Sequence, residues 1–497
     1  MMREEETVEE GEVVVVVPER AVHVGDPYPG TNVKEGADPL AHRFEIIAAC
    51  VMGLSTFSGG VLEGYTSPAI PTLLQEGSTD NLTEVSNFLD TSISATISPS
   101  FSNTTEFDAY NNSFLLKQTE SVYNSAVVMN NGSKINEQLT DLYLTEEEAS
   151  WLGSLLLLGA CVGAFVSSWV ISLGRRRAVL ASAFPRLFGW IMIGAASDVY
   201  MLYGGRFLTG VSLGIVTSAA PVYICEIAHS SVRGALSCVV QLGVNLGIFT
   251  AALLGTFVEW RGLAVFGAIT VVLYFVATLF IPNSPVWLVS SGREDDARET
   301  LHRLRGHQYC VEYDLQQIIS SKANQYNAFS WRDIITQSSC VFPLGVVALV
   351  TVVNRCSGYN AIITYCATFL HQAVPAVSEY WTAAVVTLMQ VFSTVGAAVL
   401  IDRLGRRKLL MASIAAMAVA LATIAICEVA TKHGAGGSWV AILAAIIYVS
   451  AYSLGVGPIT WVLVGEMFPQ AAREKASAII SVLNWFLAFI ITKTYFR

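Results

Sequence analysis

Charged residues are scarce in this sequence: they form 14% of its 497 residues, whereas hydrophobic residues form 53%. A soluble domain needs roughly a quarter of its residues charged to cover its surface with polar groups. The shortage of charge therefore excludes an ordinary soluble globular protein and predicts a chain that exposes apolar surface to lipid. Apolar stretches of about 20 residues agree with this, because that length crosses a hydrocarbon core of about 30 Å as a helix.

The sequence also lacks the patterns on which enzymes and cofactor-binding proteins depend. It contains no catalytic triad, no phosphate-binding glycine loop and no cluster of metal ligands, so we expect no enzymatic activity, no cofactor and no metal site. Its net charge of −10 gives no reason to expect a nucleic-acid partner. The nine cysteines lie in apolar segments or in segments that we place in the cytosol, which predicts no disulfide framework.

What the sequence does contain is a series of apolar segments, each long enough to cross a membrane as a helix. The eleven segments cover approximately residues 44–68, 151–171, 178–197, 203–224, 235–257, 262–282, 341–365, 380–401, 408–430, 439–463 and 475–495. They predict an all-α polytopic membrane protein. Residues 1–43 are Glu-rich at their start and show no signal-peptide pattern, so we expect a disordered cytoplasmic tail there.

Lysine and arginine collect in alternate connections between these segments, which places those connections together on the cytosolic side. Residues 175–177 and 403–408 are two such basic clusters. The connection at residues 75–150 holds two Lys and no Arg against twelve Asp and Glu, so we expect it outside the cell and the N-terminus inside. Four N-x-[ST] sequons in this loop predict N-glycosylation at Asn81, Asn103, Asn111 and Asn131.

Two basic turns that contain glycine occupy matching places in the chain. Residues 173–177 follow the second apolar segment, and residues 402–408 follow the eighth. A repeat of this kind predicts two six-helix halves, here residues 44–283 and 341–497, with the substrate between them at mid-membrane. The polar connection at residues 284–340 is expected to be a cytoplasmic linker with short helices, because residues 292–306 have the apolar spacing of an amphipathic helix.

Short motifs between residue 44 and the end of the chain occur in the order of one transporter family. They lie at residues 64–70 (GYTSPAI), 205–207 (GRF), 221–226 (PVYICE), 233–235 (RGA), 241–243 (QLG), 282–288 (PNSPVWL), 357–360 (SGYN), 402–408 (DRLGRRK), 457–461 (GPITW) and 484–485 (NW). In these motifs the chain resembles the sugar porters of the major facilitator superfamily. Residues 64–70 and 453–455 make it most similar to the facilitated trehalose transporters of insects.

The resemblance implies a sugar site made of uncharged amides and tryptophans. Amides both donate and accept hydrogen bonds, as sugar hydroxyl groups require, and aromatic rings pack against the C–H face of a sugar. The residues that match the family's sugar-contacting or cavity positions are Gln241, Asn360, Gln390, Trp461, Asn484 and Trp485.

Arg355 is the main departure from the family pattern, because two neutral glutamines usually stand at this position and at Asn354. A permanent positive charge beside the sugar site puts an ordinary hexose or trehalose specificity in doubt. Arg355 is therefore a further candidate for substrate binding. Either an internal acceptor such as Glu63 neutralises it, or the substrate itself supplies the acceptors.

The resemblance also implies a cytosolic gate of ion pairs, which hold the two halves together while the cavity faces outward. The matching residues are Glu226, Arg233, Asp402, Arg406, Glu466 and Arg473. Ile171 replaces the acidic residue usual in the first basic turn, so one gating contact is expected to be weaker. Gly455, Gly457 and Pro458 suit a segment that must bend.

Facilitated diffusion of a sugar or similar polar solute across the plasma membrane is the function that we expect. Proton-coupled members of the family carry an aspartate at the position of Thr66, which cannot titrate. Proton symport through Glu63 is the alternative, and a non-transporting nutrient sensor is a third. Arg186 is a second charge inside an apolar segment and faces either a neighbouring helix or a functional site. The chain ends at Arg497, before a twelfth helix, so we expect either a fragment of a longer protein, which we favour, or a protein with an external C-terminus.

Overall fold

The computed structural model describes residues 43–74, 142–229, 232–306, 311–324, 331–364, 379–432, 439–468 and 472–495. Regular structure in these ranges is helical, and an isolated bridge joins Leu74 to Leu144. The four predicted glycosylation sites and residues 1–42 of the predicted tail lie outside the described residues.

The helices before the central connection form an N-terminal half. They are α1 Arg43–Gly64, α2 Thr66–Leu73, α5 Glu146–Ser172, α6 Arg175–Gly194, α7 Val199–Ile227, α8 Arg233–Leu254 and α9 Trp260–Phe280. Two of them begin several residues before the predicted apolar segment because polar residues cap them. Thr145 and Glu148 form a capping box ahead of α5, and Asp198 accepts hydrogen bonds from the first backbone amides of α7.

The helices after the central connection form a C-terminal half. They are α14 Ser338–Cys356, α15 Tyr359–Thr364, α17 Glu379–Leu404, α18 Arg406–Lys432, α19 Trp439–Ala451, the π-helix η1 Tyr452–Val456, α20 Gly457–Met467 and α21 Arg473–Tyr495. Each of the eleven predicted segments coincides with one of these helices or with consecutive ones. Over the described residues, nine helical stretches are long and apolar enough to cross a membrane, and Trp381–Ala397 is a shorter apolar helix.

The π-helix η1 interrupts the segment in which Gly455, Gly457 and Pro458 were expected to allow a bend. Proline has no backbone N–H, so the helical ladder cannot continue unchanged around it. Ser413 of α18 supports the irregular turn, because its hydroxyl donates to the carbonyl oxygen of Ala451 at 2.6 Å and accepts from the amide of Val456 at 3.2 Å. A membrane helix tolerates such a break where neighbouring side chains satisfy the backbone.

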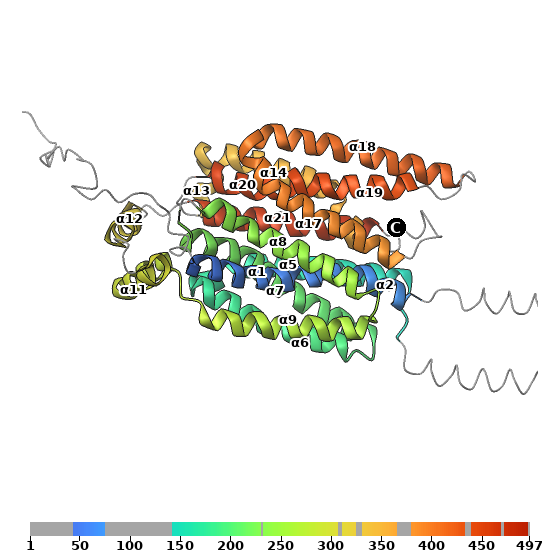
Figure 1. Ribbon diagram of the computed structural model, residues 1–497, viewed down its shortest axis with the longest axis horizontal. Helices are drawn as coiled ribbons and strands as arrows, with labels where there is room; N and C mark the ends of the chain where they lie inside the picture. The colour runs from blue at the N-terminus through green and yellow to red at the C-terminus, as the bar shows by residue number, and fades with distance from the viewer. Residues whose placement is uncertain are drawn as a thin grey trace, which may run out of the picture.

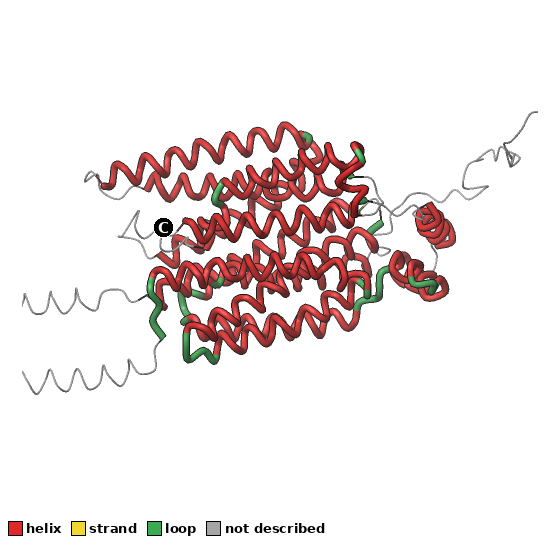
Figure 2. The backbone as a smooth tube through the Cα atoms, turned by 180° about the vertical axis from the view of Figure 1, so that it is seen from behind, coloured by secondary structure: helices red, strands yellow, loops and turns green. Residues whose placement is uncertain are grey.

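The helices of both halves run along one axis of the molecule, which has two distinct ends (Figures 1 and 2). Helices α11 Glu294–Arg305 and α12 Val311–Asn324 lie at one end, which we call the linker end (Figure 1). The short helices α10 Pro285–Ser290 and α13 Trp331–Thr336 belong to the same connection. Helix α2, which ends at Leu73 just before residues 75–141, lies at the opposite end, which we call the loop end (Figure 1).

Both predicted basic turns contain a glycine with a backbone conformation that L-residues rarely adopt. Gly174 joins α5 to α6 with a φ of 123°, and Gly405 joins α17 to α18 with a φ of 79°. Glycine has no Cβ and adopts positive φ without strain. Both basic turns thus contain a glycine with positive φ at the junction of two helices.

Helices α5 and α7 approach so closely that their contact requires glycine. A Cβ added to Gly163 would lie 2.1 Å from the carbonyl oxygen of Val211, and one added to Gly214 would lie 2.2 Å from that of Ala160. Small residues permit this approach in membranes, where close packing contributes to helix association. The outward sides of the helices carry large exposed apolar side chains such as Phe165, as lipid contact requires.

The linker helix α11 docks onto the first helix of the N-terminal half. Its buried residues Ala297, Leu301 and Leu304 lie at the amphipathic spacing that the sequence predicts. Arg305, at its last turn, forms an ion pair with the fully buried Glu45 of α1, and it also contacts Asp314 of α12 at 3.2 Å. The helix is therefore attached to the bundle and does not lie free beneath it.

Candidate functional site

The two halves meet in the middle of the molecule, where α8 packs against α17 and α5 packs against α21 (Figure 1). A group of polar side chains lies at this junction within otherwise apolar surroundings. We call it the central polar cluster: Gln241, Asn245, Arg355, Asn360, Gln390 and Asn484. Five of these six residues were predicted from the sequence as substrate-binding residues.

Asn245 joins the two halves through its side-chain amide. Its Oδ1 atom accepts from Nε2 of Gln241 at 3.1 Å and from Nε2 of Gln390 at 2.9 Å. Its Nδ2 atom donates to the hydroxyl of Thr394 at 2.5 Å, and only 1% of the residue is exposed. The sequence reasoning missed Asn245, although it stands four residues after Gln241 and therefore on the same face of α8.

Arg355 contacts three of the other predicted residues. Its Nε atom donates to Oδ1 of Asn484 at 2.7 Å, and Nη1 donates to Oδ1 of Asn360. Its guanidinium carbon also lies 5.8 Å from the ring centroid of Trp485. Asn354 instead points to α20, where its Nδ2 atom donates to the hydroxyl of Thr460 at 3.0 Å.

Glu63 is not the direct partner of Arg355. It lies within the electrostatic reach of Arg355 and Arg206, but makes no hydrogen bond or ion pair with any described residue. The acceptors that contact Arg355 are neutral amides, because α15 and α21 bring Asn360 and Asn484 next to the guanidinium group. The internal ion pair that the sequence suggested is therefore absent from the described contacts.

Arg206 holds Thr66, the residue at the position of the family's proton-coupling aspartate. Its Nη2 atom donates to the Thr66 hydroxyl at 2.5 Å, and Nη1 donates to the carbonyl oxygen of Leu62 at 3.0 Å. The guanidinium group also lies over the ring of Tyr65, 5.4 Å from its centroid. The sequence contained Arg206 only as part of a motif, and its contact with Thr66 depends on how α7 crosses the start of α2.

Arg186 faces neighbouring helices within the N-terminal half. Its Nε atom donates to the Ser212 hydroxyl at 2.9 Å, and Nη1 donates to the carbonyl oxygen of Ser55 at 3.0 Å. Its guanidinium group stacks over Tyr274 at 5.4 Å from the ring centroid. These contacts assign it a helix-packing role, the simpler of the two readings that the sequence left open.

Aromatic rings border the cluster on the side of the C-terminal half. Tyr359 and Tyr452 stack with centroids 3.5 Å apart and planes 7° from parallel, and the Tyr359 hydroxyl accepts from Gln390 at 2.5 Å. This pair was not predicted, because η1 alone brings Tyr452 to α15. Trp461 lies in α20, is partly exposed, and makes no hydrogen bond or ring contact with the described residues.

At the linker end, the predicted gating residue Glu226 forms an ion pair with Arg175, a contact that the sequence did not predict. Glu226, at the end of α7, contacts Arg175 of the first basic turn at 2.9 Å and accepts from the Ser284 hydroxyl at 2.5 Å. Arg406 begins α18 and is partly buried. The side chains of Arg233, Asp402, Glu466 and Arg473 lie outside the described residues.

Two aromatic contacts join the halves at the loop end. The Lys493 ammonium group of α21 lies 4.1 Å from the ring centroid of Trp151 in α5. Phe257, just after α8, meets Trp381 of α17 edge to face, with centroids 5.8 Å apart. Both contacts must break if the halves separate at this end.

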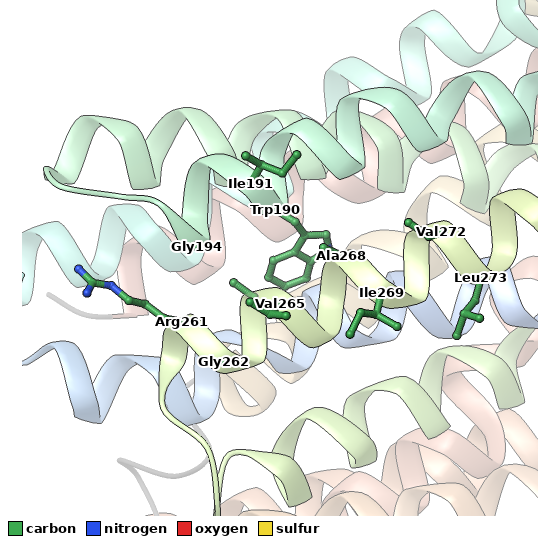
Figure 3. Close-up of a pocket in the computed structure, with 11 residues that line it drawn as sticks. Trp190, Ile191, Gly194, Arg261, Gly262, Val265, Ala268, Ile269, Val272 and Leu273 are labelled. Carbon is green, nitrogen blue, oxygen red and sulfur yellow. The ribbon is translucent and has the colours of Figure 1, made fainter.

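A cavity of about 600 Å³ between α6 and α9 lies outside the central polar cluster (Figure 3). Val265, Ile269 and Leu273 line it, and all three are exposed on the outward side of the bundle. Arg261 at its edge is the single charged residue in the lining. An apolar cleft open to lipid cannot satisfy the hydroxyl groups of a sugar, so we exclude it as the transport site.

Comparison with known proteins agrees with this architecture. The family model described as "Sugar (and other) transporter" matches residues 96–496. Facilitated trehalose transporters from Polypedilum vanderplanki and Bombyx mori are 34% and 33% identical over 72% and 71% of this chain, covering 73% and 71% of their own lengths.

Solved structures show the same fold. The partially occluded inward-open xylose transporter XylE from E. coli matches with a TM-score of 0.67 at 17% identity, over 91% of both chains. A second XylE structure, described as a major facilitator superfamily proton:xylose symporter bound to 6-bromo-6-deoxy-D-glucose, also has a TM-score of 0.67, at 18% identity, over 91% of this chain and 88% of that chain. The chain has the major facilitator fold and belongs to the family of sugar (and other) transporters.

Proposed function

We propose that this chain carries a sugar or a similar small polar solute across the membrane by facilitated diffusion. The observation that supports this most is the central polar cluster between the halves. Oε1 of Gln390 and Nδ2 of Asn484 are buried there without a hydrogen-bond partner among the described residues. A buried amide left in this state is costly, and a solute hydroxyl group that reaches it removes the cost.

Flat aromatic surfaces beside these amides suit the other face of a sugar. The Tyr359–Tyr452 pair and the Trp485 ring offer apolar planes against which a C–H face can pack. The substrate-binding residues that we propose are Gln241, Asn360, Gln390, Trp461, Asn484, Trp485 and Arg355. Asn245 positions two of them, because Gln241 and Gln390 both donate to it.

Facilitation without an energy source is supported by the contact between Thr66 and Arg206. The Thr66 hydroxyl accepts a hydrogen bond from the arginine. The hydroxyl stays neutral between pH 5 and 8, so it cannot couple transport to a proton. The relatives named facilitated trehalose transporters agree with this mode. Proton symport is the second candidate, because Glu63 is a carboxylate inside α1 without a hydrogen bond or ion pair among the described residues.

Transport by alternating access requires a gate at each end of the molecule, so that the central cavity opens to one side at a time. At the linker end, we propose that Glu226, Arg233, Asp402, Arg406, Glu466 and Arg473 form the gate that the family pattern implies. Arg175 joins them through its ion pair with Glu226. At the loop end, Trp151, Lys493, Phe257 and Trp381 form the opposing gate.

The topology that we propose follows from the charge of the connections. Residues 1–43 and the linker at 284–340 are cytoplasmic, and the loop at 75–150, with its four glycosylation sites, is extracellular. Residues 44–283 and 341–497 form the two halves, in a multi-pass protein of the plasma membrane.

Uptake by purified protein in liposomes tests the proposal. Radiolabelled trehalose, glucose and xylose should equilibrate to the external concentration and no further, with and without a proton gradient. Liposomes that contain the Asn484→Leu variant should take up at least about tenfold less, because a buried hydrogen bond is removed. Protein that is folded and moves none of these solutes, nor any polyol or sugar acid, would favour the sensor alternative instead.

A further inference from the structure

The central polar cluster presents more donors than acceptors around Arg355. A guanidinium group carries five N–H donors and no acceptor. The amide oxygens of Asn360 and Asn484 must therefore face it, as they do in the structure. Arg355 thus occupies the acceptors of two residues that a neutral sugar would use, and leaves their amide N–H groups to other partners.

Two buried donors next to Arg355 have no hydrogen-bond partner among the described residues. They are Nδ2 of Asn484 and Nε1 of Trp485, in side chains that are 1% and 5% exposed. Nδ2 belongs to the amide that already bonds Arg355, and the Trp485 ring lies 5.8 Å from the guanidinium carbon. A ligand that satisfies these two donors must bring acceptor oxygens, whereas the buried Oε1 of Gln390 requires a donor such as a hydroxyl group.

The charge at the site points in the same direction. The described residues that accept hydrogen bonds from the Arg355 guanidinium are neutral amides, and only 8% of the residue is exposed. Glu63 is within electrostatic reach of Arg355 but forms no ion pair with it among the described residues. Burying a cation without a carboxylate partner is costly, and an anionic ligand offsets that cost.

We propose that the solute carried here is a hydroxylated carboxylate, such as a uronic or aldonic sugar acid, whose carboxylate binds Arg355. Nδ2 of Asn484 and Nε1 of Trp485 donate to the same carboxylate or to the neighbouring ring oxygen. The inference rests on the proposed transport function and names its substrate class.

Competition between matched solutes tests the proposal in the unaltered protein. Glucuronate, its neutral amide glucuronamide, and glucose should be compared for uptake in liposomes and for thermal stabilisation of the purified protein. We expect glucuronate to be preferred by about tenfold or more over glucuronamide, because charge-assisted bonds to arginine are much stronger than neutral ones. Uptake of glucuronate should also respond to a potassium-valinomycin membrane potential, whereas uptake of glucose should not.

Variants at position 355 then test whether Arg355 is the residue that binds the carboxylate of the solute. Arg355→Gln should lose at least about tenfold of glucuronate uptake and retain or gain glucose uptake, and Arg355→Lys should keep part of the preference. Thr423→Val is the control, since this exposed hydroxyl of α18 bonds only within its own helix, and it should leave the ratio of acid to neutral uptake unchanged. Glucose or trehalose transport with no response to glucuronate overturns the substrate class and leaves sugar transport standing. Folded protein that moves neither kind of solute overturns both.

Discussion

Replacing Asn245 with leucine should shift the balance between the two conformations of the transporter. The substitution removes three hydrogen bonds, and two of them, to Gln390 and Thr394, connect the halves. Side-chain hydrogen bonds inside membrane proteins contribute about 0.6 kcal/mol each. Losing the two bonds between the halves therefore costs the observed conformation about 1.2 kcal/mol, a shift of roughly eightfold in the equilibrium.

Spin labels at the loop end measure this shift directly. Tyr200 lies in the first turn of α7 and Trp439 begins α19, both are exposed, and they belong to different halves. In the Asn245→Leu protein, the ratio of the longer-distance to the shorter-distance population should grow about eightfold relative to the parent. Thr423→Val, which removes an exposed hydroxyl of α18 that bonds only within its own helix, is the control. An unchanged distance distribution in Asn245→Leu would refute the role of Asn245 in joining the halves.

Three further outcomes follow from the site and the packing. Gln241→Ala should weaken the affinity for the true substrate about ten- to hundredfold at normal surface expression, because about 1–3 kcal/mol is lost with a buried hydrogen bond; unchanged transport kinetics would remove Gln241 from the site. Glu63→Gln should leave transport without any proton dependence, as in the parent, whereas accumulation above the external concentration that disappears in this variant would establish proton symport. Gly163→Val should abolish folded, membrane-inserted protein, since its side chain would enter the carbonyl group of Val211; normal expression and heat stability would contradict the close packing of α5 and α7.

Local features of the chain were readable from the sequence because they depend on neighbouring residues only. A membrane helix needs about 20 apolar residues in succession, so hydropathy alone located eleven segments that coincide with helices, and nine helical stretches of the described residues are long and apolar enough to cross a membrane. The amphipathic spacing at residues 292–306 likewise predicted α11, and each of the two basic turns contains a glycine with positive φ, Gly174 or Gly405. The resemblance to the family singled out Gln241, Gln390, Asn360 and Asn484, and the structure places all four in the central polar cluster.

The partners of these side chains were decided by the tertiary structure. Arg355 binds Asn484, which stands 129 residues away, and not Glu63, because α21 crosses the end of α14 at that point. Glu226 of α7 forms an ion pair with Arg175 of α6, which stands 51 residues earlier in the chain. Asn245 becomes the link between the halves only where α8 meets α17. Hydropathy sets which segments enter the membrane, but a hydrogen bond forms over about 3 Å, and that distance is set by how distant helices cross.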